Sequence, residues 1–313
     1  MPTRRHVRQM APLLAAAVAL ASCGGGDTKK SPAGGDLAGD GARLTKQASG
    51  PNKAARTGVI DAKVSFTLKG LPGYEAFANS VSGPFSYRNG AALPDYELEI
   101  GARDYGVGLT SVGGRSWVSL GSTGYPLPAT ARRLLVKASA KGANGLTRTL
   151  EQFGIAPWRW ETKQRVAGFA RLDGVQVVRI STGAEVGRIL RDANTLLRFM
   201  TSLGLTRATG LPHEIGPAAR RVIVHNVRSF TANSWIGVKD HVLRRSGFTM
   251  TFAVPAKDRA KVAGISGGTV VGELNVTEVG RPHEISKPST VGSIDDFRVG
   301  IDAVGDAQDA KRG

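Results

Sequence analysis

Apolar and polar residues alternate along several stretches of the chain after about residue 44. This period of two is typical of half-buried strands, because successive side chains of a strand point to opposite faces of its sheet. Glycine and proline bound these stretches, which favours antiparallel strands joined as hairpins. The clearest alternating apolar positions are Val64, Phe66 and Leu68; Tyr96, Leu98 and Ile100; Val107 and Leu109; Val118 and Leu120; Phe248, Met250, Phe252 and Val254; and the run 269–279.

Two stretches between these strands have the spacing of amphipathic helices. Residues 130–153 predict one or two helices with a break near 141–145, where two glycines interrupt the pattern. Residues 184–203 give a stronger pattern, because their apolar residues fall on one stripe and Gly204 follows as a stop signal. That stripe consists of Val186, Ile189, Leu190, Ala193, Leu196, Leu197, Met200 and Leu203.

The order of strands, helix, strands, helix and strands predicts an α+β fold. A helix with one apolar stripe must bury it, and the natural partner here is the sheet. We therefore expect a long antiparallel meander covered on one face by helices. No linker interrupts residues 45–290, which we expect to form one domain, and residues 291–313 are expected to form a weakly structured tail.

The N-terminal residues have the features of a bacterial lipoprotein signal. A basic segment precedes an apolar run at 11–20, which is shorter than the roughly 20 residues that cross a bilayer as a helix. The run ends in Leu-Ala-Ser-Cys at 20–23, which resembles the box where such signals are cleaved. The resemblance implies a signal peptide over 1–22 and a diacylglycerol (palmitate) anchor on Cys23. An ordinary secretory signal with a chance cysteine is the alternative.

The anchor would place the protein at the cell membrane, on the extracytoplasmic face. The residues after Cys23 are rich in Gly, Ser, Ala, Asp and Lys, and we expect a flexible tether over 23–44. Cys23 is the single cysteine of the 313 residues, which excludes an intramolecular disulfide and a zinc site built on several thiolates.

The composition is globular and strongly basic. Apolar residues make up 41% of the chain, which allows a sizeable core, and the formal net charge is +17. Export argues against nucleic acid as a partner. The charge instead favours attraction to polyanions of the envelope, such as anionic lipid heads or wall polymers. The alternative is that the arginine content serves solubility alone.

Two short motifs suggest chemistry at first sight. Gly264, Ser266 and Gly268 match the G-x-S-x-G pattern of hydrolases, but a polar segment precedes the serine and a strand-like run follows it. A nucleophile elbow needs the reverse order of a strand and then a helix. The repeated pairs His213-Glu214 and His283-Glu284 lack the spacing of metal ligands. We expect no catalytic residue, metal site or cofactor, with a Ser266 hydrolase kept as an alternative.

A longer resemblance runs through the predicted domain. It is carried by Ser82-Gly83-Pro84-Phe85, 93–98, 108–111, 115–118, 124–128 and Phe153-Gly154-Ile155-Ala156-Pro157. This succession resembles the LppX/LprA/LprF/LprG lipoproteins, which share a fold with the LolA-type lipoprotein carriers. The resemblance implies a curved antiparallel half-barrel with helices covering its concave face. It also implies an apolar cavity there, which holds the acyl chains of a lipid or glycolipid.

The residues that would line such a cavity are the apolar positions of the predicted strands and of the helix at 184–203. They are Val64, Phe66, Leu68, Leu98, Ile100, Leu109, Ile189, Leu196, Met200, Phe252 and Leu274. Ordinary core packing is the alternative for each of them, because periodicity does not distinguish a packed core from a lined cavity. A lipid-binding or lipid-transport lipoprotein is therefore the leading hypothesis. A non-enzymatic surface lipoprotein that binds anionic polymer or a protein partner is the second.

Overall fold

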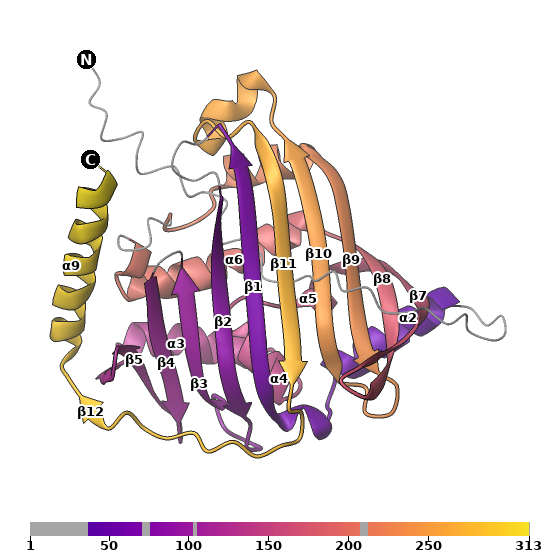
Figure 1. The fold of residues 1–313 in the computed structure, drawn as a ribbon, viewed down its shortest axis with the longest axis horizontal. Coiled ribbons are helices and arrows are strands. Elements are labelled where there is room, and N and C mark those ends of the chain that lie inside the picture. Colours follow the sequence, from indigo (N-terminus) through magenta and orange to yellow (C-terminus); the bar gives the residue numbers. More distant parts are fainter. Residues whose placement is uncertain (1–36, 71–75, 103–104, 207–211, 313) are drawn as a thin grey trace.

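The computed structural model describes residues 37–70, 76–102, 105–206 and 212–312. Its centre is one sheet of twelve strands in the order β12-β6-β5-β4-β3-β2-β1-β11-β10-β9-β8-β7, shown in Figure 1. All neighbouring strands are antiparallel except β12 and β6. The strands are β1 Thr57–Lys69, β2 Ala76–Ser86, β3 Asp95–Ala102, β4 Tyr105–Val112, β5 Arg115–Leu120, β6 Thr123–Pro126, β7 Glu161–Leu172, β8 Val175–Ala184, β9 Val227–Gly237, β10 Leu243–Ala253, β11 Gly267–Thr277 and β12 Thr290–Val291.

The alternation in the sequence gives the sheet one buried face and one exposed face. In β1, Val64, Phe66 and Leu68 are buried, whereas Lys63 before Val64 and Thr67 between Phe66 and Leu68 are exposed. The buried side chains of β3, β10 and β11 continue this face through direct register partners across the ladder. The prediction of half-buried antiparallel strands is confirmed.

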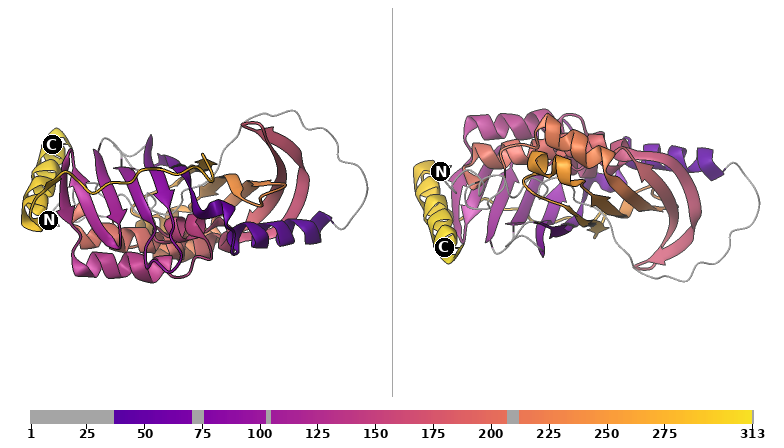
Figure 2. Two further views of the ribbon diagram at one scale, coloured as in Figure 1. Left: turned by 90° about the horizontal axis from the view of Figure 1, so that it is seen from below. Right: turned by 90° about the horizontal axis from the view of Figure 1, so that it is seen from above.

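The helices lie on the buried, concave face of the sheet, which Figure 2 shows from two sides. They are α2 Leu37–Ser49, α3 Ala129–Ser139, α4 Gly145–Glu151, α5 Pro157–Trp160, α6 Val186–Ser202 and α8 Pro217–His225. Two short 3-10 helices lie at strand ends: η1 Ala54–Arg56 precedes β1, and η2 Ala256–Val262 connects β10 to β11. The two helices α3 and α4, and the helix α6, correspond to the predicted helical stretches. The predicted α+β half-barrel with a helix-covered concave face is confirmed.

The sheet curls most strongly at its β7–β8 end (Figure 2). The ladder between β7 and β8 shifts register between Thr162 and Arg165 and again between Val166 and Gly168. Lys163 has a positive φ of 53° at the first shift. Such bulges bend a strand and increase its twist, which explains the curl at this end.

The C-terminal residues differ from the expected tail. The chain passes along one end of the strands to β12, which pairs with β6, and ends in α9 Ile294–Arg312 (Figure 1). Phe297 and Ile301 of α9 are buried, and the Phe297 ring lies 5.5 Å from that of Tyr125. The expectation of a weakly structured tail over 291–313 was therefore wrong, because these two residues bury an apolar stripe at the edge of the sheet.

The expected tether over 23–44 is also shortened by the structure. Residues 37–44 form the first part of α2, because Leu44 and Ala48 of this helix pack against the core. Cys23 and the expected signal peptide over 1–22 lie outside the described residues. Within the described part of the chain, no helix combines the length and apolar character that crossing a bilayer requires.

Candidate functional site

The floor of the candidate site is the concave face of β4, β3, β1, β11 and β10. Eight of the residues predicted to line a cavity lie there, each with at most 5% of its surface exposed. Their registers place them close together: Leu98 is the direct partner of Leu109, and Leu274 is the direct partner of Ala62 beside Val64. The eight are Val64, Phe66, Leu68, Leu98, Ile100, Leu109, Phe252 and Leu274.

The roof of the site is α6. Ile189 and Met200 are 1% and 3% exposed, and Leu196 is partly buried against the same cluster. The structure thus gathers the predicted residues from sheet and helix into one continuous apolar layer. We call this layer, defined by those eleven residues, the concave interior.

Aromatic side chains that the sequence analysis did not assign to the site cross the concave interior. The ring of Tyr96 in β3 lies 6.5 Å from that of Phe153, in an edge-to-face arrangement. Phe153 in turn lies 6.3 Å from Phe199 of α6. This chain of rings connects the sheet to the helix layer. Phe153 follows α4, at the end of the stretch 130–153 that was predicted as helical but for which no apolar stripe was assigned.

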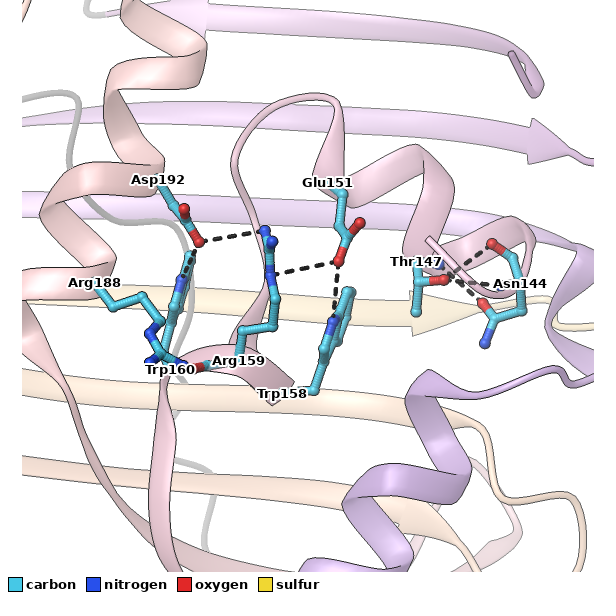
Figure 3. Close-up of polar contacts among 8 residues, drawn as sticks. All are labelled: Asn144, Thr147, Glu151, Trp158, Arg159, Trp160, Arg188 and Asp192. Carbon is cyan, nitrogen blue, oxygen red and sulfur yellow. Dashed lines mark hydrogen bonds and ion pairs between the residues drawn. The ribbon is translucent and has the colours of Figure 1, made fainter. Parts of the chain in front are cut away.

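Beside the apolar layer, a polar cluster joins α4, α5 and α6 (Figure 3). The guanidinium of Arg159 lies between two carboxylates, 3.5 Å from Glu151 Oε1 and 3.3 Å from Asp192 Oδ2. The indole of Trp158 donates to Glu151 at 3.2 Å, and that of Trp160 donates to Asp192 at 2.9 Å. We call these five residues the arginine clamp, because one cation holds three helices together.

The charges of the arginine clamp hold the three helices in place. Glu151 is almost fully buried, and burial raises the pKa of its carboxyl although Arg159 acts in the opposite direction. Asp192 belongs to α6 but lies outside the apolar stripe predicted for this helix. The structure shows that this carboxylate contacts α5 and so fixes α6 over the sheet.

A second polar cluster lies where α2 crosses β7. Gly41 allows a close approach, because a Cβ there would lie 3.0 Å from the backbone of Gln164 and Arg165. One turn later, the hydroxyl of Thr45 donates to Glu161 at 3.4 Å, and Ser234 of β9 donates to the same carboxyl at 2.5 Å. Burial raises the pKa of Glu161 to about 7, and these hydroxyls oppose part of the rise.

The motifs that suggested chemistry are not arranged for it. Ser266 follows η2 and precedes β11, and its backbone pairs with Lys69 and Val254 in a loop. A strand-serine-helix elbow is therefore not formed at this residue. His213 lies 3.4 Å from Thr201, and His283 lies 3.8 Å from Glu278. Among the described residues, no group of three or more His, Cys, Asp or Glu side chains is gathered as metal ligands would be.

Comparison with known proteins gives similarities of structure rather than of sequence. No protein family's sequence profile and no curated protein matches the chain. The structure is similar to LprF from Mycobacterium bovis, at 12% identity and a TM-score of 0.41 over 81% of this chain and 99% of that one. It is also similar to the lipoprotein LppX from Mycobacterium tuberculosis, at 12% identity and a TM-score of 0.35 over 79% and 99% of the two chains.

A LolA superfamily protein from Nitrosomonas europaea is similar at 7% identity and a TM-score of 0.24, over 77% of this chain and 94% of that one. The identities of these three similar structures to this chain are 7% to 12%.

Proposed function

We propose that the protein is a membrane-anchored extracytoplasmic lipoprotein that binds or carries a lipid or glycolipid within the concave interior. The observation that carries the proposal is the concave interior itself, a continuous apolar layer between a curved open sheet and α6. Its eleven residues meet through apolar side chains alone. An acyl chain that enters between them replaces apolar contacts with apolar contacts and breaks no strand ladder.

Such binding needs no chemistry from the protein. Each methylene group removed from water contributes about 0.8 kcal/mol, so an acyl chain can be held by apolar contact alone. We accordingly propose a binding protein and not an enzyme, with no cofactor. Acylated Cys23 would hold it at the extracytoplasmic face of the membrane.

The test is extraction of the purified full-length protein with organic solvent, followed by mass spectrometry. We expect a non-covalently bound lipid, and uptake of a fluorescent fatty acid after the bound lipid is removed. Cys23→Ser is the control, because it lacks the thiol that would carry the anchor. It should lose membrane association and keep the interior lipid. Absence of both extracted lipid and fatty-acid uptake would contradict the proposal.

A second candidate, binding to anionic envelope polymer or lipid heads, is favoured by the outer surface of the helix layer. Exposed cations of α3, α6 and α8 lie there without an ion-pair partner among the described residues. They are Arg133, Lys137, Arg198 and Arg221. Helices α3 and α8 both pack against α6, so these exposed cations belong to one layer of helices.

Vesicle sedimentation tests this second candidate. We expect the protein to bind vesicles of phosphatidylglycerol in a salt-dependent manner and to ignore vesicles of phosphatidylcholine, because screening weakens attraction between exposed charges. The variant Lys137→Glu/Arg198→Glu should bind several-fold more weakly. Lys63→Glu, on the opposite face of the sheet, is the matched control and should bind as the parent does. Equal binding by all three would remove this candidate.

A further inference from the structure

Three buried hydroxyl groups lie side by side on the concave face of β3, β4 and β5. Tyr96 is the direct register partner of Ser111, and Ser111 is the direct partner of Ser116. Direct partners of an antiparallel ladder share one face of the sheet, so the three side chains form a row across it. Tyr96 and Ser111 are fully buried, and Ser116 is 6% exposed.

None of the three hydroxyls has a hydrogen-bond partner among the described residues. The Ser111 hydroxyl is near enough to Tyr96 to act on its pKa against the larger effect of burial, but the two groups do not meet with hydrogen-bond geometry. A buried hydroxyl without a partner is costly, and native proteins leave few of them. Three in one row indicate a group that supplies their partners from outside the chain.

The surroundings of the row indicate the chemistry of that group. Phe85 is the register partner of Tyr96 on its other side, and the ring of Phe153 packs against Tyr96 from the helix layer. Burial raises the pKa of Tyr96, which keeps its hydroxyl neutral and able to donate. Neutral donors in an apolar enclosure suit a neutral oxygen-bearing group, because burial of a charge without a counter-charge is unfavourable.

We propose that Tyr96, Ser111 and Ser116 form a polar subsite that hydrogen-bonds the hydroxyl or ester oxygens of a glycerol or sugar headgroup. This inference rests on the proposed function and adds the orientation of the ligand. The acyl chain extends along the apolar residues of β3 and β1, and the uncharged oxygen-rich part of the lipid lies at β3 to β5.

The test compares two probes that share an eighteen-carbon chain and differ in headgroup, 1-monooleoylglycerol and 1-octadecene. Each displaces a fluorescent fatty acid from the full-length protein. Tyr96→Phe and Ser111→Ala/Ser116→Ala should bind 1-monooleoylglycerol roughly ten-fold more weakly, and bind 1-octadecene as the parent does. Ser119→Ala is the matched control, because Ser119 lies on the opposite face of β5 and its loss should change neither affinity.

A stability measurement accompanies the binding experiment. Removal of a hydroxyl that lacks a partner should leave the melting temperature of the lipid-free protein unchanged or raise it. If the variants lose affinity equally for both probes, the three hydroxyls have a structural role and the inference is overturned. Unchanged affinity for 1-monooleoylglycerol in the variants would also overturn it. If the parent binds neither probe, the proposed function itself fails, which distinguishes the two.

Discussion

At the scale of single residues, Arg159 lies near the surface but forms ion pairs with carboxylates of two different helices. It neutralises Glu151, which is almost fully buried, and Asp192, which is partly buried. The two neighbouring tryptophans donate to the same carboxylates, so removal of the guanidinium leaves each carboxylate with one remaining donor. The arginine clamp thus depends on this one cation.

Arg159→Ala should lower the free energy of unfolding by about 2–4 kcal/mol, because a buried carboxylate is left without its counter-charge. Arg43→Ala is the matched control. Its ion pair with Asp40 is exposed on both sides and should change stability by less than about 0.5 kcal/mol. Urea unfolding of both variants measures the difference. Equal, small effects would show that the clamp does not hold the helices.

Glu161 makes the stability of the fold depend on pH. Its contribution falls as the pH rises, which is the opposite of the usual behaviour of a carboxyl group. Burial raises its pKa from 4.5 to about 7, so the folded state favours the protonated carboxyl. The stabilisation is complete below pH 4.5, where the unfolded chain is also protonated, and is lost as the pH rises through about 7.

Glu161→Gln should remove this dependence, because an amide does not ionise. The difference in unfolding free energy between variant and parent should grow by about 2–3 kcal/mol between pH 4.5 and pH 7.5. Unfolding curves across that range measure the difference, and the comparison cancels other groups that titrate. A difference that stays constant over this range would mean that folding does not raise the pKa of the Glu161 carboxyl.

At the scale of elements, the junction between α4 and α6 requires a glycine. Gly154 has a φ of +73°, and a Cβ there would lie against the backbone oxygen of Asp192. Glycine alone combines this backbone conformation with so close an approach. Helix α6 can pack directly against the turn after α4 because Gly154 has no side chain to separate them.

Gly154→Ala should destabilise the protein by about 3 kcal/mol or more, because strain and a steric clash act together. Gly204→Ala is the matched control. Its φ of +79° is similar, but nothing lies within 4 Å of the added Cβ, so its cost should be about 1 kcal/mol. Thermal unfolding distinguishes the two. A similar loss at both sites would show that the α4–α6 contact is not tight.

The elements that the sequence predicted are those with a strong period. Strands β1 and β3 alternate without interruption, and β10 alternates from Phe248 to Ala253. The apolar stripe at 184–203 closely matches α6. Strands were expected between the two helical stretches, where the β7–β8 hairpin lies, but no residues were assigned to them, because the bulges of β7 disturb its alternation and its side chains are mostly half-buried. Asp173-Gly174, with φ values of 47° and 79°, is a typical hairpin turn and could have revealed it.

Some residues of the candidate site could be predicted from a periodic pattern, and others could not. Its apolar residues follow from periodicity, because position on a strand or helix face determines their burial. The arginine clamp and the Glu161 cluster do not follow from the sequence. Each brings together side chains from separate elements, as when Thr45 of α2 meets Ser234 of β9, and no local pattern encodes such a meeting. Helix α9 was missed because its glycines and acidic residues obscure an apolar stripe of few residues.

At the scale of the whole molecule, the proposed lipid binding depends on how the sheet and the helix layer pack together. The sheet is open, the helices lie on its concave face, and α2 and α9 lie at opposite ends (Figures 1 and 2). The arginine clamp holds the helices to one another, whereas the concave interior contains apolar contacts alone. In the proposed function, an acyl chain would enter between α6 and the sheet.

Photolabelling of the full-length protein with a diazirine-bearing fatty acid tests this central claim most directly. After proteolysis, mass spectrometry identifies the labelled residues. We expect saturable labelling of the concave interior on β1, β3 and α6, at residues such as Val64 and Met200. The exposed Lys63 and Thr67 should stay unlabelled. Unlabelled fatty acid should compete. Labelling confined to the exposed face, or no saturable labelling, would contradict the claim that the concave interior holds a lipid.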